Sequence, residues 1–332
     1  MAGPVLEVLD GGVLTTVQDA GRPDWAHLGV PESGSADPWS RIVANLLVGN
    51  DPTDAVLEAT LVGPAFAVLA SVTIGLAGAD LGARIRGGRR LATDRSHRLA
   101  PGDIVEMSGA AGPTEARSAC RAFLALPGGV DVPPVLGSRS TCLAAALGGL
   151  HGRPLATGDR IAARAAVLLR PELVWPSPDD AAAAPVLRVL PAADAGSRPL
   201  LDALLAGDWR IALASDRVGV RLDGDPLEPG LGGETTTHGV AWGAIQVPAD
   251  GRPIVLGPDH QTTGGYRVAG VVISADRPIL GQLRPGATVR LVETDRETAL
   301  AALRAQRDAL VAGTAALRDA AGWDTLADAA GG

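Results

Sequence analysis

Glycine and proline interrupt this chain at short intervals along most of its length. The 332 residues include 43 glycines and 25 prolines, and many of these stand between short runs of valine, isoleucine and leucine. Pairs such as Pro101-Gly102 and Asp250-Gly251 are tight-turn sequences, and short apolar runs bounded by such turns are typical of β-strands. Hydrophobic residues make up 46% of the chain, enough for a substantial core. The sequence therefore predicts a mainly β protein.

Two stretches have the spacing of helices instead. Residues 38–49 place apolar side chains at positions i, i+3, i+4 and i+7, and Asp37 stands at the N-cap position. A second helix is predicted from Thr294, where Glu297 completes a capping box, and the tail after Gly313 is either helical or frayed. One stripe of this second helix is apolar: Leu300, Leu303 and Leu310.

A weak internal repeat divides the chain. Residues 71–87 are similar to residues 210–224, and residues 99–107 are similar to residues 283–291. The second copy is longer and includes Glu234 to Tyr266, which we interpret as an insertion; chance similarity in a chain this rich in alanine and glycine is the alternative. The predicted domains are an N-terminal β-rich unit over 1–174, a linker over 175–185, a β-barrel unit with a site-bearing insertion over 186–292, and a helical tail over 293–332.

The charged residues limit the possible partners. The net charge is −8, which argues against nucleic acid or an anionic membrane as the main partner. All 29 basic residues are arginine. Without lysine the chain cannot form a Schiff base, lacks the lysine of a P-loop, and cannot carry lysine-linked biotin. Any ATP that it uses must be bound by arginine and backbone groups, or by a partner.

Several features favour a cytoplasmic protein without a metal site. Met1 to Gly12 has no basic or apolar region of a signal peptide, and the apolar run Ala65 to Ala79 is too short to span a bilayer and predicts buried strands. Cys120 and Cys142 lack metal-type spacing and are expected to be reduced, buried thiols. The five histidines are dispersed, without the spacing of metal ligands.

The stretch from Gly257 to Tyr266 is the strongest candidate site. It follows a strand-like run, and a carboxylate, a primary amide and threonine hydroxyls together can hold a small polar substrate. Its two adjacent glycines can adopt positive φ and aim backbone N–H groups at an oxyanion. The alternative is an ordinary hairpin turn whose polar side chains have no role in binding. The polar and permissive residues are Asp259, Gln261, Thr262, Thr263, Gly264 and Gly265.

Further polar candidates lie before this stretch. Asp19 and Arg22 either pair across a glycine turn, or Arg22 binds a carboxylate or phosphate while Asp19 orients it. Asp37 is either a helix N-cap or a site carboxylate at a helix N-terminus, where anions gather. Asn45, on the polar side of the first helix, is either a surface residue or a ligand. Arg139 is flanked by hydroxyl residues that favour anion binding, but the loop lacks the spacing of a Walker A motif.

A set of motifs, taken in order, resembles one known family over the chain as far as about Leu291. This is the allophanate hydrolase subunit 2 family, also called the biotin-dependent carboxyltransferase-like family or the family of the 5-oxoprolinase C subunit. The motifs are Val17-Gln-Asp-Ala-Gly-Arg22, Gly29-Val-Pro, Ser33-Gly-Ser-Ala-Asp37, Ala44-Asn45, Val48-Gly-Asn50, Leu57-Glu-Ala-Thr60, Ser138-Arg-Ser-Thr141, Gly243-Ala-Ile-Gln-Val-Pro248 and Asp259 to Tyr266.

The resemblance implies two cyclophilin-like β-barrel units with a few short helices and a C-terminal helix. It also implies the C subunit of an ATP-dependent 5-oxoprolinase, which opens 5-oxo-L-proline to L-glutamate with the A and B subunits. The alternatives are a carboxyltransferase component that acts on urea or a related amide with a biotin carrier, and a regulatory antagonist that binds a partner similar to the B subunit. Some carboxyltransferase members use an active-site lysine, which this chain lacks, so the oxoprolinase interpretation is favoured.

Opening a lactam with ATP requires an anion clamp, donors at the developing oxyanion and a base. We expect Arg22 and Arg139 to bind anionic groups and Asp259 to act as base or orienter, with Asp19 and Asp37 as supporting carboxylates. The remaining substrate-binding candidates are Asn45, Gln261, Thr262, Gly264, Gly265 and Tyr266. ATP is expected on this chain or on a partner subunit, and no metal is expected.

Overall fold

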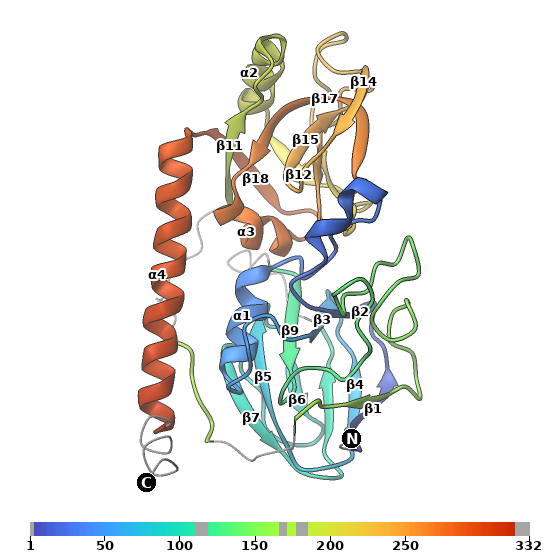
Figure 1. Cartoon of the computed structure of the whole chain (residues 1–332), viewed down its shortest axis with the longest axis vertical. Helices are drawn as coiled ribbons and strands as arrows, with labels where there is room; N and C mark the ends of the chain where they lie inside the picture. Colours follow the sequence, from blue (N-terminus) through green and yellow to red (C-terminus); the bar gives the residue numbers. More distant parts are fainter. Residues whose placement is uncertain (1–2, 110–118, 166–170, 177–184, 323–332) are drawn as a thin grey trace. The chain divides into compact units, whose positions relative to one another are not determined.

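The chain forms two compact units in the computed structural model, which describes residues 3–109, 119–165, 171–176 and 185–322 (Figure 1). The first unit comprises Met1–Gly21, Pro38–Ala181 and Arg307–Gly332, and the second comprises Arg22–Asp37 and Ala182–Gln306. The chain therefore enters the second unit twice. Residues 22–37, which precede the first long helix in sequence, belong with the C-terminal half of the protein.

The described strands of the first unit form two five-stranded antiparallel sheets. Residues from both sheets, such as Phe66 and Ile74, belong to one buried apolar core. The first sheet has the order β10 (Arg160–Ala162), β1 (Pro4–Asp10), β4 (Ala65–Val68), β8 (Ile104–Met107) and β6 (Ala83–Ile85). The second has the order β2 (Leu14–Gln18), β3 (Val56–Thr60), β9 (Arg121–Ala125), β5 (Val72–Gly78) and β7 (Arg95–Leu99).

Helix α1 (Pro38–Leu46) packs on the second of these sheets. It lies so close to β5 that a Cβ atom on Gly75 would come within 2.1 Å of the Ala44 carbonyl oxygen, so only glycine fits there. The helix starts immediately after Asp37, as its sequence predicts. The apolar run 65–79 forms β4 and β5, which confirms the prediction of strands in that run.

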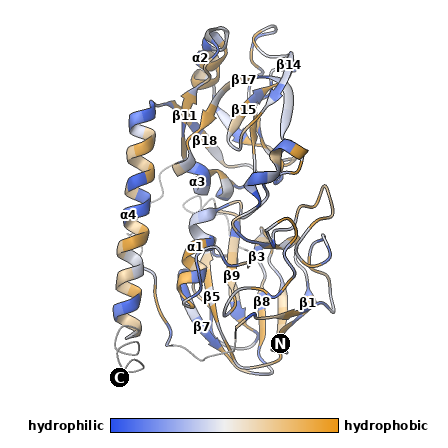
Figure 2. Ribbon diagram, in the orientation of Figure 1, coloured by the Kyte–Doolittle hydropathy of each residue, from blue (hydrophilic) through white to orange (hydrophobic). Residues whose placement is uncertain are grey.

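The long C-terminal helix α4 (Arg296–Ala321) alternates apolar and polar residues along its length (Figure 2). Its residues from Arg307 onward pack in the first unit, where a Cβ atom on Gly313 would lie 2.3 Å from the ring of buried Trp175. The predicted cap at Thr294 is wrong by one residue. The helix starts at Arg296, and the Asp295 carboxylate accepts a hydrogen bond from Thr298 N at 2.8 Å, which lowers the pKa of Asp295.

The second unit contains a closed β-barrel. Among its described strands, seven form the ring, because β11 pairs in parallel with β18 and antiparallel with β17. Apolar side chains such as Leu187, Ile245 and Val255 fill the interior. The ring order is β11 (Val186–Pro191), β18 (Thr288–Glu293), β12 (Trp209–Ile211), β13 (Gly219–Asp223), β16 (Ile254–Leu256), β15 (Ala244–Val247) and β17 (Thr263–Val272), with β14 (Glu234–Gly239) paired outside it on β17.

Short helical segments accompany this barrel. A 3-10 turn in residues 22–37 is followed in the C-terminal half by two more turns and two α-helices. These are η1 (Pro23–Leu28), η2 (Ala195–Ser197), α2 (Arg198–Ala206), η3 (Ser274–Asp276) and α3 (Arg277–Gln282). Within the described ranges, none of the helices combines the length and the apolar character that crossing a lipid bilayer requires.

The prediction of a mainly β protein with a C-terminal helix is confirmed, but the units differ from the expected ones. The closed barrel is in the second unit, whereas the described strands of the first form two sheets. Residues 234–266 are not an insertion, because β15 and β16 are part of the ring. Residues 177–184 of the predicted linker and 323–332 of the predicted tail lie outside the described residues.

Replacing Gly281 with alanine is expected to destabilise the second unit. An alanine at an exposed helix position normally gains about 1 kcal/mol over glycine. At Gly281 a Cβ atom would come within 2.0 Å of the Ala36 carbonyl oxygen, so α3 or residues 36–37 must shift, at a cost of about 1–3 kcal/mol. Thermal unfolding followed by circular dichroism checks this, with Gly239→Ala as control because a Cβ atom at Gly239 meets nothing within 4 Å. A higher melting temperature for Gly281→Ala would contradict the packing.

Candidate functional site

A buried ion pair organises the loop between β16 and β17. The Asp259 carboxylate accepts hydrogen bonds from Arg217 Nε at 2.8 Å and from Arg217 Nη2 at 3.2 Å. Arg217 Nη2 also donates to the Gly34 carbonyl oxygen at 2.6 Å, and the two side chains of the pair are 3% and 4% exposed. The pair thus joins the turn before β13, the loop before β17 and residues 33–37. Both oxygens of Asp259 are already bonded, so this carboxylate is placed to orient the loop.

His260, the next residue, has a ring nitrogen that is available for proton transfer. Its Nδ1 lies 2.6 Å from the Gln261 carbonyl oxygen, which can only accept, so geometry assigns the ring proton to Nδ1. Among the described residues no hydrogen-bond partner reaches Nε2. Burial lowers the pKa of His260, with Arg277 adding to this and Glu32 and Asp259 opposing it. A neutral imidazole with a free Nε2 lone pair can accept a proton.

Residues 22–37 place further polar groups in the same unit. Ser33 adopts a φ of 56°, is 1% exposed, and donates its backbone N–H to the Pro258 carbonyl oxygen at 2.9 Å. The Ser33 hydroxyl is buried, and no described residue is in hydrogen-bond contact with it. Positive φ costs a non-glycine residue about 1–3 kcal/mol and occurs often at functional sites. The strained turn therefore lies against the loop that carries Asp259 and His260.

Arg22 and Asp37, at the two ends of this segment, are each 2% exposed. Arg22 N donates to the Glu32 carbonyl oxygen at 2.7 Å, and Asp37 accepts a hydrogen bond from Gln282 Nε2 at 2.8 Å. Both side chains are buried. Their positions fit supporting roles better than direct contact with a substrate.

A pair of glutamines lies beside the start of β17. Gln246, 2% exposed, accepts a hydrogen bond from Gln261 Nε2 at 3.2 Å, while no described residue bonds its own Nε2. Gln261 itself is exposed, and Thr262 is half-buried. Tyr266 is 39% exposed. Gln246 thus holds an exposed amide that can contact a substrate.

The two adjacent glycines do not form the predicted oxyanion turn. Gly264 and Gly265 have no positive φ and lie in β17, paired with β14. Glycine at position 264 serves a different purpose, because a Cβ atom there would lie 2.3 Å from Gln246 Nε2 and the Gln246 amide would have to move. The pairing of β17 with β14 fixes the backbone conformation, and the close contact with Gln246 explains why position 264 is a glycine.

Gly264→Ala and Gly265→Ala form a matched pair of variants. At Gly264 the new methyl group must displace Gln246, whereas at Gly265 the nearest atoms are 3.6 Å away, which is an ordinary contact. We expect Gly264→Ala to lower stability by about 1 kcal/mol, because the displaced group is the end of a flexible side chain, and to disturb Gln261, while Gly265→Ala changes stability by less than about 0.5 kcal/mol. Urea denaturation of the two variants measures this difference. Equal effects would contradict the packing on Gln246.

The first unit holds the other candidates. Asp19 accepts hydrogen bonds from Ser138 Oγ at 2.5 Å, from Ser140 Oγ at 2.6 Å, from Gly21 N at 2.8 Å and from Arg139 N. Thr141 Oγ1 donates to the Val17 carbonyl oxygen at 3.0 Å. The hydroxyls of the 138–141 loop are therefore used to fix the loop to the end of β2, and an acidic residue occupies its centre.

Arg139 and Asn45 differ in how many of their side-chain polar atoms are already hydrogen-bonded. Arg139 Nε donates to the Val132 carbonyl oxygen at 2.8 Å, and no described residue bonds its terminal nitrogens, which remain able to bind an anion. Asn45 is 0% exposed, donates to the Asp54 carbonyl oxygen and accepts from Asn50 Nδ2. The alternative that Asn45 is a surface residue is wrong, because the residue is buried and both ends of its amide are used inside the first unit.

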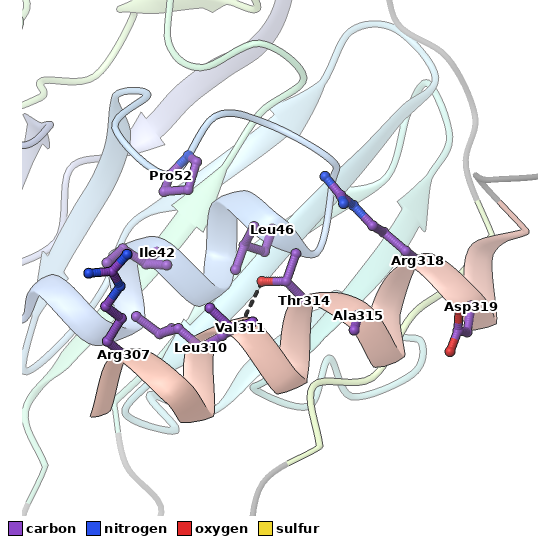
Figure 3. Close-up of a pocket in the computed structure, with 10 residues that line it drawn as sticks. All are labelled: Ile42, Leu46, Pro52, Arg307, Leu310, Val311, Thr314, Ala315, Arg318 and Asp319. Carbon is purple, nitrogen blue, oxygen red and sulfur yellow. Dashed lines mark hydrogen bonds between the residues drawn. The ribbon is translucent and has the colours of Figure 1, made fainter. Parts of the chain in front are cut away.

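An apolar groove in the first unit lies apart from these candidates (Figure 3). It is a cavity of about 520 Å³ between α1 and α4. No candidate site residue named above is among the residues that line it. Its lining is mainly apolar, with an arginine towards each end: Ile42, Leu46, Leu310, Val311, Arg307 and Arg318.

The predicted site residues thus fall into two groups. Asp19, Asn45 and Arg139 lie in the first unit, and Arg22, Asp37 and the residues of the 259–266 stretch lie in the second. Sequence reasoning missed Arg217, His260 and Gln246. The position of His260 between Asp259 and Gln261 was a usable signal, whereas Arg217 is 42 residues from its partner and had none.

The family follows from a match over most of the chain. Residues 28–293 match the family described as carboxyltransferase domain, subdomain A and B. The chain belongs to this family. It is 34% identical to the C subunit of 5-oxoprolinase from Escherichia coli over an alignment of 316 residues that covers 91% of this chain and 96% of that protein. It is 30% identical to the 5-oxoprolinase C subunit of Haemophilus influenzae, covering 86% of this chain and 90% of that protein. The resemblance seen in the sequence motifs is confirmed.

The carboxyltransferase-domain family also includes much larger proteins. The structure is similar to that of urea carboxylase from Kluyveromyces lactis, with a TM-score of 0.80 and 27% identity over 94% of this chain. The chain spans only 29% of that structure. The family fold is therefore shared by separate subunits and by domains of multidomain enzymes.

Proposed function

We propose that the chain is the C subunit of an ATP-dependent 5-oxoprolinase, which opens 5-oxo-L-proline to L-glutamate together with the A and B subunits and is inactive without them. The observation that carries this proposal is the match to the C subunit of the Escherichia coli 5-oxoprolinase. The alignment covers 91% of this chain and 96% of the relative. A subunit of the same extent and family is the simplest role for such a chain.

The reaction sets three requirements. 5-Oxoproline is an unactivated cyclic amide with a carboxylate, and ATP would supply activation by phosphorylating the amide oxygen. ADP leaves, a base takes a proton from the water that adds to the activated carbon, and the ring nitrogen departs as the amine. A second water then releases inorganic phosphate from the resulting acyl phosphate, and donors must stabilise the charge that develops on the carbonyl oxygen. The substrate carboxylate also needs a cation or a set of N–H donors.

In this proposal, His260 is the base, because its Nε2 lone pair is free, and Asp259 is the orienter, because Arg217 occupies both of its oxygens. Gln261, fixed by Gln246, would hold the lactam amide. Thr262, Tyr266 and the exposed start of β17 with Gly264 and Gly265 would complete the binding surface. Arg22 and Asp37, in the same unit, would support it from buried positions.

We assign ATP binding mainly to a partner subunit. The 138–141 loop resembles a phosphate loop in composition, but its Arg139 N donates to Asp19, its Ser140 N to Ser138 Oγ, and its Thr141 N to the Val17 carbonyl oxygen. These N–H groups are not available to phosphate. The terminal nitrogens of Arg139 are the groups of this loop that are left for binding an anion.

Carboxyl transfer to urea or a related amide is the second candidate, and the fold shared with urea carboxylase favours it. It would need a biotin carrier on another protein, because this chain has no lysine. The two candidates are separated by incubating the chain and its partner subunits with ATP and either 5-oxo-L-proline, or urea and bicarbonate with a biotinylated carrier. We expect glutamate from the first mixture. Carboxylation only in the second mixture would replace the proposal.

A further inference from the structure

An arginine stacked on a tryptophan marks a second site in the second unit. Arg277, the first residue of α3, has its guanidinium carbon 4.5 Å from the centre of the Trp242 ring. Its Nη2 is 3.5 Å from the Trp242 carbonyl oxygen. The tryptophan is 6% exposed, so the cation is held against a nearly buried aromatic face.

The polar atoms of this pair are incompletely bonded. Arg277 forms no ion pair with a carboxylate of the described residues, and its buried Nε has no hydrogen-bond partner among them. The same holds for the buried Nε1 of Trp242. Burial also lowers the pKa of Arg277, which the charge of Glu32 partly offsets. Both of these atoms are closed off from solvent, so an anion would reach the pair through the terminal nitrogens of the half-buried Arg277, where its charge would compensate the cation.

Trp242 and Arg277 both line a cavity of about 610 Å³. Most of its wall is apolar, and it includes the half-exposed Leu300 and Leu303 of α4. Its carboxylates have other partners, because Glu293 accepts from Arg198 at 2.8 Å and Asp295 accepts from Thr298 N at 2.8 Å. A cavity of this size with an apolar wall and one cluster of donors has the character of a small-molecule site.

We propose that this cavity binds a small monocarboxylate with an apolar chain. Its carboxylate accepts hydrogen bonds from the terminal nitrogens of Arg277, and its chain lies against Leu300 and Leu303. None of the residues of the loop that carries Asp259 and His260 lines the cavity, although the charge of Arg277 also acts on His260. The inference does not depend on the proposed oxoprolinase activity, because it concerns binding to this chain alone.

Calorimetric titration of the whole chain with octanoate tests the proposal, with 1-octanol as a neutral probe of similar length and acetate as a short one. We expect saturable binding of octanoate at one site and much weaker binding of the other two. Arg277→Gln is expected to weaken octanoate binding about 10- to 100-fold, the usual effect of losing hydrogen bonds from a charged group. Trp242→Phe keeps an aromatic ring beside the guanidinium and removes only an indole N–H that is closed off from solvent, so octanoate binding should change by less than about threefold.

Arg296→Gln is the matched control, because Arg296 lines the same cavity from the first turn of α4 but is exposed. It should change octanoate binding by less than about threefold. Thermal unfolding of each variant identifies misfolding, and the comparison of octanoate with 1-octanol on the unmodified chain needs no variant. No saturable octanoate binding, equal binding of 1-octanol, or equal losses in Arg277→Gln and Arg296→Gln would each overturn the proposal.

Discussion

Replacing Asp259 with alanine is expected to lower the free energy of unfolding by about 3–5 kcal/mol. The variant leaves the Arg217 guanidinium, 3% exposed, without the carboxylate that accepts two of its hydrogen bonds. In the variant, the free energy of desolvating the guanidinium is no longer offset by its attraction to a carboxylate. Removing one member of a buried ion pair therefore destabilises a protein far more than replacing both members with apolar residues. Urea denaturation followed by circular dichroism measures the change.

Two controls make this prediction specific. Combining Asp259→Leu with Arg217→Met should recover most of the lost stability, because no unpaired charge then remains. Asp223→Ala removes one partner of the exposed pair with Arg252, whose side chains are 54% and 53% exposed, and should cost less than about 1 kcal/mol. If Asp259→Ala costs no more than Asp223→Ala, the buried pair does not organise the loop. Activity lost in Asp259→Ala is therefore interpretable only after folding is measured.

His260→Asn is expected to lower turnover in the assembled enzyme by about 10²- to 10⁴-fold, the usual contribution of a general base. Asparagine can still donate to the Gln261 carbonyl oxygen, as His260 Nδ1 does at 2.6 Å, but it has no group equivalent to Nε2. Stability should therefore change little. His238→Asn is the matched control, because exposed His238 makes the same kind of contact from Nδ1, to the Thr236 carbonyl oxygen at 3.0 Å.

The pH dependence gives His260 a second test. Burial lowers the pKa of His260 below its usual 6.5, so the base is neutral at pH 7 and turnover should fall only as the pH drops below 6.5. The folded state binds fewer protons than the unfolded state in that range, so His260 also reduces stability as the pH falls from 6.5 through its lowered pKa. His260→Asn should abolish this contribution. An acidic limb that is unchanged in the variant, or turnover close to that of the unmodified protein, would contradict the assignment.

Patterns that are local in the sequence predicted much of this structure. The glycine and proline spacing predicted the β-rich fold, and apolar periodicity predicted α1 and the long C-terminal helix. The position of the helix cap was wrong by one residue because Thr294 and Asp295 are both good caps, and only the backbone geometry decides between them. The family motifs located the loop that carries Asp259.

Features that depend on distant partners could not be predicted. The burial of Asn45 depends on Asn50 and on the Asp54 carbonyl oxygen, and the bonding of Asp19 depends on a loop about 120 residues away. Gly264 was interpreted as a turn residue because glycine permits positive φ, whereas the packed side chain of Gln246 is the actual constraint. The assignment of residues 22–37 to the second unit likewise follows from tertiary contacts that have no local signal.

The central claim is that this chain is an essential subunit of an ATP-dependent 5-oxoprolinase. The most direct measurement is glutamate release from 5-oxo-L-proline and ATP by the chain together with its A and B subunits, with each protein omitted in turn. We predict release by the complete mixture and its loss when this chain is left out. Equal release without this chain, or no release from a folded and assembled complete mixture, would contradict the claim.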